Sequence, residues 1–187
     1  LGLVDGYTEQ GVGHVVQLLH HLSCKTAVGN LFKIMLSWAQ RYAGYSESIL
    51  QQPHLPLQHL PAPWIQTTCA HLARTHCKIT FDIGCIPQLQ RLYDRCIMDE
   101  TLSLNPKRRA AINRCRLFLK CETFADLCTP SGLYFQPSLF RGGPALPSDA
   151  TTAWPYQPSP GPKTWSAFRK FLKGYLHSSG RLRKPLG

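Results

Sequence analysis

Apolar residues recur at helical spacing over the first fifty positions of the chain. Two stripes are present, one in residues 8–24 and one in residues 26–42. Thr8 is placed to cap the first helix, and Gly44 is a natural stop for the second. The stripes consist of Val12, Val15, Val16, Leu18, Leu19 and Leu22, and of Leu31, Ile34, Met35, Trp38 and Tyr42. The pattern predicts a helical hairpin over residues 1–50. The apolar faces of its two helices are wide, and we expect the rest of this chain to leave part of them exposed to solvent.

The helical pattern stops at residues 51–63. Four prolines in this segment each remove a backbone donor and favour extended geometry in the preceding residue, which predicts a Pro-rich linker or a wrapping loop. Helical spacing resumes from Pro63 to about His76 and predicts a third helix. Its buried side is expected to contain Trp64, Ile65, Thr68, Cys69 and Leu72.

Weaker patterns follow the third helix. Residues 77–81 alternate like a short strand, and residues 133–135 are the other good strand candidate. Together they are candidates for one short two-stranded β-ribbon. Pro87 suits the first turn of a fourth helix that runs to about Met98. Its core stripe is predicted to be Leu89, Leu92, Tyr93, Cys96 and Ile97.

A clear local signal is Asn105-Pro106, a capping residue followed by a proline at the first helical position. It predicts a fifth helix that runs to Leu119. Ala110, Ile112, Cys115 and Leu119 are expected to face inward, while Lys107, Arg108, Arg109, Arg114, Arg116 and Lys120 are expected to lie mostly outward. Thr123 is expected to cap one more short turn.

Residues 130–162 contain eight of the fifteen prolines and four glycines, which predicts a long Pro/Gly-rich connector. Thr164 is then expected to cap a last helix. Its apolar face is Trp165, Phe168, Phe171, Leu172 and Tyr175, with Arg169, Lys170 and Lys173 opposite. The expected fold is mainly α, in five segments: the hairpin 1–50, the linker 51–63, a central basic helical region 64–129, the connector 130–162, and a C-terminal basic helix and tail 163–187.

The charge is strongly positive and unevenly distributed. Twenty-one Lys and Arg against ten Asp and Glu give a formal net charge of +11. Residues 1–85 carry five basic and four acidic groups, whereas residues 161–187 carry seven basic groups and no acidic one. Such an excess favours phosphate backbones or anionic membrane surfaces as partners, and simple solubility is the alternative explanation.

The candidate contact residues for nucleic acid are Lys107, Arg108, Arg109, Arg114, Arg116, Lys120, Arg169, Lys170, Lys173, Arg181, Arg183 and Lys184. A row of Arg and Lys along a helix matches a phosphate backbone. The alternative is a solvated face that keeps the chain soluble. Five aromatic residues are candidates either for stacking on unpaired bases or for packing: Tyr134, Phe135, Trp154, Tyr156 and Trp165.

The eight cysteines form no metal-binding or catalytic signature. Cys69, His71, His76, Cys77 and Cys85 are metal-ligand residue types, but the sequence has no Cys-x-x-Cys pair, so neither a metal site nor a cofactor is expected. No nucleophile signature is present, and the segment is expected to be non-catalytic. Reduced cysteines in the core of an intracellular, cytoplasmic or nuclear chain are expected, because no secretory signal opens the sequence. No segment is expected to span a bilayer, because no apolar stretch is long enough, and nucleic acid is expected as the partner of the positive charge instead of a membrane.

Several motifs occur in order along the chain. They are Tyr7-Thr8-Glu9-Gln10-Gly11 near the start, Ile112-Asn113-Arg114-Cys115-Arg116-Leu117-Phe118-Leu119 with Ala125-Asp126-Leu127 in the centre, and Trp154-Pro155, Trp165 and Pro185-Leu186-Gly187 toward the end. The chain resembles the region that follows the reverse-transcriptase domain in non-LTR retrotransposon polyproteins and precedes an RNase H-like segment. The resemblance implies a fragment of a longer polyprotein whose catalytic aspartates lie upstream, because no aromatic-x-Asp-Asp motif occurs here.

On this interpretation the segment is a noncatalytic thumb-like or connecting region that grips the RNA or DNA backbone. The parent polyprotein would resemble an RNA-directed DNA polymerase. The competing interpretation is a structural scaffold or protein-interaction module without nucleic-acid binding, whose helices pack on neighbouring domains of the same polyprotein. A third class is an independent enzyme.

Overall fold

The computed structural model describes residues 5–81, 85–89, 91–141 and 154–187. These residues contain seven α-helices and one short 3-10 helix, and their only β-pairing consists of isolated bridges. The predicted mainly α fold is therefore confirmed. The chain divides into two compact units. We call Leu1–Ala43 with Glu47–Ile86 the N-terminal unit, and Gly44–Ser46 with Pro87–Gly187 the C-terminal unit.

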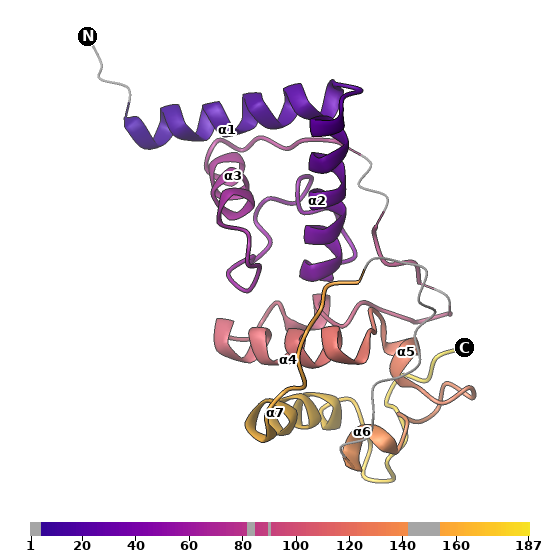
Figure 1. Cartoon of the computed structure of the whole chain (residues 1–187). Coiled ribbons are helices and arrows are strands. Elements are labelled where there is room, and N and C mark those ends of the chain that lie inside the picture. The colour runs from indigo at the N-terminus through magenta and orange to yellow at the C-terminus, as the bar shows by residue number, and fades with distance from the viewer. Residues whose placement is uncertain (1–4, 82–84, 90, 142–153) are drawn as a thin grey trace. The chain divides into compact units, whose positions relative to one another are not determined.

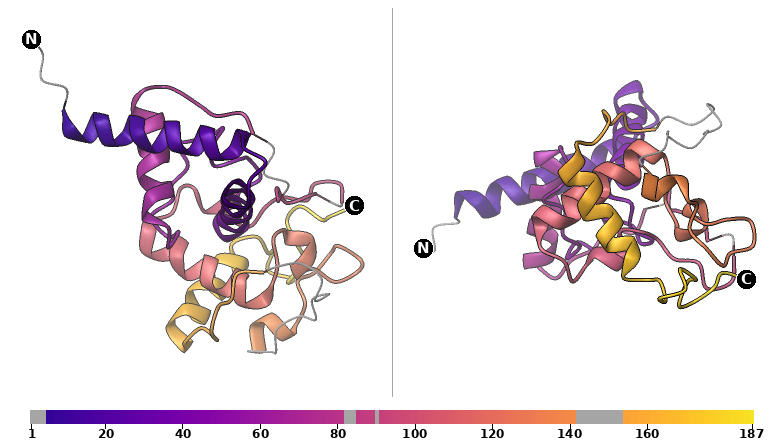
Figure 2. Two further views of the ribbon diagram at one scale, coloured as in Figure 1. Left: turned by 45° about the horizontal axis from the view of Figure 1, so that its top comes forward. Right: turned by 90° about the horizontal axis from the view of Figure 1, so that it is seen from below.

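The N-terminal unit consists of α1 (Gly6–Ser23), α2 (Ala27–Ala43) and α3 (Pro63–Arg74), as Figure 1 shows. The three predicted helices are present, but α1 and α2 run across one another and not side by side as in the predicted hairpin (Figures 1 and 2). The α1 helix begins one turn earlier than predicted, because the side chain of Asp5 accepts a hydrogen bond from the backbone N–H of Tyr7 at 2.9 Å. Between α2 and α3 the chain wraps closely on the unit, since Leu57 and Leu60 are buried.

The apolar stripes of α1 and α2 are only partly buried. On α1, Leu18 and Leu22 lie in the core, whereas Val12, Val16 and Leu19 are about half exposed. The buried residues of α2 are Gly29, Leu36, Ala39, Gln40 and Ala43. The predicted stripe residues Leu31, Ile34 and Met35 are instead exposed, so α2 packs through a different face, on which Leu36 lies among smaller residues.

The predicted helix at residues 87–98 is wrong, since its described residues form no helix. Tyr93 adopts a left-handed backbone conformation with φ 63°, which a helix does not tolerate. The N–H of Ile97 donates to the carbonyl of Glu122 at 3.0 Å, and Cys96 forms an isolated antiparallel bridge with Thr123. Pairing with a distant segment thus replaces local helical hydrogen bonds.

The predicted β-ribbon is not confirmed. The N–H of Ile79 donates to the carbonyl of Leu50, and Phe135 forms an isolated bridge with Cys128 rather than with residues 77–81. Each strand candidate is therefore paired within its own unit.

The C-terminal unit contains η1 (Asp99–Thr101), α4 (Pro106–Leu119), α5 (Phe124–Leu127), α6 (Ser138–Arg141) and α7 (Pro162–Lys173). The α4 and α7 helices pack side by side (Figures 1 and 2). The predicted cap of α4 is confirmed, because the Asn105 side chain accepts from the N–H of Arg108 at 2.9 Å. The predicted turn after Thr123 is α5, closed by a capping box with Asp126.

The apolar face of α7 supplies much of this unit's core. Phe168 and Leu172 are fully buried, as predicted. The helix begins at Pro162 after Gly161, not at the predicted Thr164 cap. Residues 142–153 of the predicted connector lie outside the described residues. The described residues on either side contain α6 and Trp154, whose indole N–H donates to the carbonyl of Leu117 at 2.8 Å.

The last residues of the chain are integrated into the C-terminal unit. Leu182 and Leu186 are buried, and their N–H groups donate to the carbonyls of Leu133 and Gly132 at 2.8 and 3.0 Å. Gly132 has φ 66°, and its Cα faces the carbonyl of Leu186 so closely that a Cβ would meet the oxygen. The absence of a side chain at Gly132 therefore permits both the left-handed turn and the close packing of the tail against it.

Candidate nucleic-acid interface

Nearly all of the net positive charge belongs to the C-terminal unit. Residues 87–187 contain sixteen Lys and Arg and six Asp and Glu, so they account for +10 of the total of +11. The carboxylates described in this unit make internal contacts. Asp94 accepts from the backbone N–H of Ala125, Asp126 from that of Thr123, and Asp99 from that of Ser46. The positive surface is therefore left largely uncompensated.

Two of the predicted contact residues on α4 are buried, so their predicted outward orientation is wrong. Arg116 is fully buried and donates to Asn113 Oδ1 at 2.9 Å and to the carbonyl of Cys121 at 3.3 Å. Arg109 is also buried and donates to the carbonyls of Leu102 and Leu104 at 3.2 and 2.8 Å. These guanidinium groups satisfy backbone carbonyls near the two ends of α4, which is a structural role.

The other predicted residues of α4 remain available at the surface. Lys107, Arg108, Arg114 and Lys120 are exposed. The first three lie along α4, while Lys120 ends it in a left-handed conformation with φ 56°. The α4 contribution to a basic surface is thus four side chains instead of the predicted six.

Lysines on α7 form the most regular basic feature of the unit. Lys163, Lys170 and Lys173 are exposed and spaced so that they share one face of the helix. Among the described residues, none of the three has an ion-pair partner. We call them the α7 lysine stripe. Lys163 was not among the predicted contact residues, although its distance of seven residues from Lys170 would have identified it.

The remaining predicted residues differ in their roles. Arg169 is half-buried, and its Nε donates to the carbonyl of Leu139 at 3.2 Å, which fastens α6 to α7. Arg181, Arg183 and Lys184 are exposed on the tail. The Nε of Arg183 also donates to the carbonyl of Leu176 at 3.2 Å, so this side chain is partly held in place.

A groove of about 400 Å³ lies between α4 and α7. Arg108 lines it from α4 and Lys170 from α7, so two cations from different helices border one hollow. The acidic side of the groove is internally paired: the Tyr175 hydroxyl donates to Glu100 Oε2 at 2.9 Å, and Arg95 lies 3.5 Å from Glu100 Oε1. Burial, followed by this hydrogen bond, raises the pKa of Tyr175. The arrangement suits an anionic group such as a phosphate.

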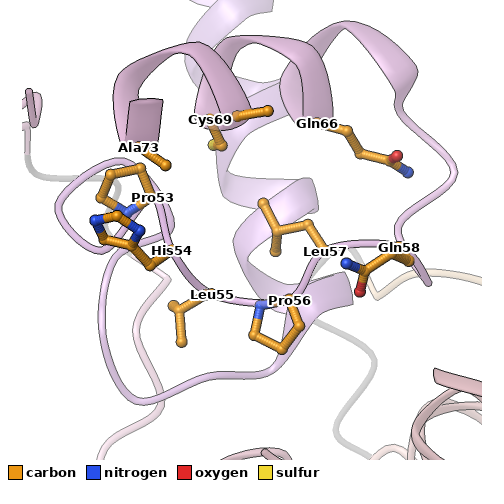
Figure 3. A pocket seen from close by; sticks show the side chains of 10 residues that line it. Pro53, His54, Leu55, Pro56, Leu57, Gln58, Gln66, Cys69 and Ala73 are labelled. Atoms are coloured by element: carbon orange, nitrogen blue, oxygen red, sulfur yellow. The ribbon is translucent and has the colours of Figure 1, made fainter. Parts of the chain in front are cut away.

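A different pocket lies in the N-terminal unit, between α3 and the loop at residues 53–58 (Figure 3). It has a volume of about 360 Å³, and its lining contains no Lys, Arg, Asp or Glu. Cys69 from α3 lines it, and its thiol donates to the carbonyl of Ile49 at 3.4 Å. Burial raises the pKa of this thiol to about 12, so it stays protonated at neutral pH and is a poor nucleophile.

The other buried cysteines behave in the same way. All eight cysteines are unbridged, and five are buried. Burial raises the pKa of Cys96, Cys115 and Cys128 to about 12, which is the behaviour of small core residues. No group of three or more His, Cys, Asp or Glu in the described part of the chain could hold a metal ion. Likewise, none of the described helices is long and apolar enough to cross a membrane.

Comparison with protein-family models, with curated proteins and with solved structures found no match to this chain.

Proposed function

We propose that the C-terminal unit binds the phosphate backbone of RNA or DNA, as a noncatalytic thumb-like or connecting segment of a reverse-transcriptase polyprotein. The observation that supports this proposal most directly is the α7 lysine stripe beside the groove that Arg108 and Lys170 border. The resemblance of the sequence to retrotransposon polyproteins supplies the setting. Such a segment would act in the cytoplasm or the nucleus, with neighbouring domains of its own polyprotein.

The spacing of the stripe fits a polyanion. Ten residues separate Lys163 from Lys173, and an α-helix rises 1.5 Å per residue, so the stripe extends over roughly 15 Å. Successive nucleotides of one strand rise by about 3.4 Å along a duplex, so about four phosphates fall within that length. Lysine donates to phosphate oxygens as a point charge without reading the base, and the expected binding is therefore insensitive to sequence.

The test is the salt dependence of binding to a short labelled duplex. A triple variant, Lys163→Gln with Lys170→Gln and Lys173→Gln, should weaken binding and reduce the slope of log affinity against log salt by about 2–3, since each phosphate contact contributes about 0.9. The matched control removes three lysines of the N-terminal unit, by Lys25→Gln, Lys33→Gln and Lys78→Gln. Equal losses in both triple variants, or a salt-independent affinity, would reject the stripe as the contact surface.

The N-terminal unit favours a second candidate function, that of an interaction module. Val12, Val16 and Leu19 are spaced to share one side of α1, and Leu31, Ile34 and Met35 project from α2, all of them exposed. A neighbouring domain of the same polyprotein is the partner that this candidate requires. Replacing Leu31 and Ile34 by Ser should reduce self-association of the isolated chain in light-scattering measurements without changing its affinity for nucleic acid. A wild-type chain that stays monomeric at high concentration would count against this candidate.

A further inference from the structure

The C-terminal unit contains a second hollow, distinct from the groove between α4 and α7. It has a volume of about 560 Å³ and lies where three segments meet: the turn after α5, the short helix α6 and the end of α7. Its lining includes Thr129, Tyr134, Phe135, Phe140, Lys173 and Leu176. This volume is within the range of about 300–1,000 Å³ that is typical of small-ligand pockets.

The walls of this pocket are fixed by hydrogen bonds between backbone groups. The N–H of Thr129 donates to the carbonyl of Tyr134 at 2.8 Å, and the N–H of Gln136 donates to the carbonyl of Leu127 at 2.9 Å. Arg169 joins α6 to α7 through the carbonyl of Leu139. The pocket is therefore formed before any ligand arrives, which lowers the entropic cost of binding.

The lining defines the chemistry of the occupant. It is mainly apolar and aromatic, it contains one cation, Lys173, and it contains no Asp or Glu. Phe135 is buried, whereas Tyr134 is 45% exposed and lines the pocket, so a ligand there can reach it. A planar apolar group with a negative charge beside it satisfies both features, because the ring can stack on an aromatic side chain while the anion meets the lysine.

Lys173 connects this pocket to the proposed backbone contact, since it belongs both to the α7 lysine stripe and to the pocket lining. We propose that the pocket accepts an unpaired base of a single-stranded nucleic acid whose phosphates lie along the α7 lysine stripe. This inference rests on the proposed function and deepens it, because it predicts a preference for single strands over blunt duplexes.

The test compares the full chain with two tyrosine variants on labelled oligonucleotides of one sequence, single-stranded and as a blunt duplex. Tyr134→Ala should weaken single-strand binding roughly 5- to 150-fold, the usual loss when a stacking ring is removed, and should leave duplex binding unchanged. Tyr134→Phe keeps the ring and should bind like the wild type. Tyr93→Ala is the matched control, because Tyr93 is 68% exposed, does not line the pocket and is not one of the stacking candidates.

The outcomes separate this inference from the proposed function. Binding that depends on salt and on the α7 lysine stripe, yet is unaffected by Tyr134→Ala, would overturn the base pocket alone. Absence of any salt-dependent binding would reject both. A nucleoside monophosphate that displaces the oligonucleotide at equal concentration would also overturn the inference, since the site would then be one for free nucleotides.

Photocrosslinking gives a readout that does not depend on a variant folding. A single strand that carries 5-iodouracil should crosslink to Tyr134 or Phe140 of the unaltered chain when the adduct is mapped by mass spectrometry. Adducts found only at Tyr156, or only in the N-terminal unit, would contradict the proposal.

Discussion

The guanidinium of Arg116 lies directly against the Cα of Gly44, so closely that a Cβ on Gly44 would come within 2.6 Å of the guanidinium carbon. Gly44 also has φ 74°, a conformation that side-chain-bearing residues rarely adopt. Gly44 was expected from the sequence only as the residue that ends a helix. Its second role is to leave room for the guanidinium of Arg116, which is more than seventy positions away in the sequence. This role is visible only in the fold.

We therefore expect Gly44→Ala to destabilise the C-terminal unit by roughly 2–4 kcal/mol, from the left-handed backbone and from overpacking against Arg116 together. Urea unfolding followed by circular dichroism measures the change. Gly13→Ala is the matched control, since nothing lies within 4 Å of a Cβ at this α1 position and Ala favours the helix by up to about 1 kcal/mol. A neutral Gly44→Ala would show that Arg116 can move aside freely.

The two arginines of the central motif are expected to respond in opposite ways. Arg116→Met removes hydrogen bonds from the carbonyl of Cys121 and from Asn113 and should cost about 3 kcal/mol or more. Arg114→Met alters only an exposed side chain and should change stability by less than about 0.5 kcal/mol, while weakening nucleic-acid binding. Thermal unfolding and a binding assay on the same samples check both. Similar stability losses in the two variants would contradict the structural role of Arg116.

Lys120 offers a variant that separates charge from stability. Because it ends α4 at φ 56°, Lys120→Gly should stabilise the unit by about 1 kcal/mol while removing a predicted contact. Lys120→Ala removes the same charge but keeps the strain, so its stability should equal that of the wild type. Weaker nucleic-acid binding by both variants could then not be attributed to unfolding. Equal unfolding free energies for the Gly and Ala variants would argue against the backbone strain.

Stability should fall in alkali. Burial raises the pKa of the Cys69 thiol from an ordinary 9 to about 12, so above pH 9 the unfolded chain loses this proton while the folded chain keeps it. The folded state then binds more protons, and the free energy of unfolding decreases with pH by up to about 1.4 kcal/mol per unit for each such group. Burial raises the pKa of Tyr45 to about 12 as well, which extends the loss above pH 10.

Urea unfolding measured from neutral pH upward checks this prediction. Cys69→Ala should make the decline between pH 9 and 12 shallower, and Cys77→Ala, at an exposed position, is the control. An unchanged slope in Cys69→Ala would show that this thiol is not the source of the decline.

The elements that could be predicted from the sequence are those whose ends are set by residues within the same few positions of the chain. Asn105-Pro106 fixes the start of α4, and Thr123 with Asp126 fixes α5, because cap, proline and capping box act within four residues. Residues 87–98 carry a helical apolar pattern as well. There, however, the segment's backbone pairs with the chain just before α5 and Tyr93 turns left-handed, which no pattern within the segment could reveal.

The candidate site was only partly predictable for a related reason. Apolar periodicity assigns arginines to the outside of a helix, yet Arg109, Asn113 and Arg116 form a buried polar row on α4. Their burial depends on carbonyls at the ends of the helix that need donors, and those carbonyls are positioned by tertiary structure. The exposed lysines of α7 were predictable because their spacing along one helix face is a local property. The aromatic pocket was not, since it joins three separate segments.

The backbone that carries the three exposed cations of the C-terminal tail is held in place by folding. Arg181, Arg183 and Lys184 are close in sequence to Leu182 and Leu186, whose side chains are buried and whose backbone is hydrogen-bonded to the turn at residues 132–133. A loose basic tail would lose backbone freedom on meeting an anionic partner, at a cost of about 1–2 kcal/mol for every residue it ordered. Here folding has already ordered that backbone, so this part of the entropy cost would not arise if the tail met an anionic partner.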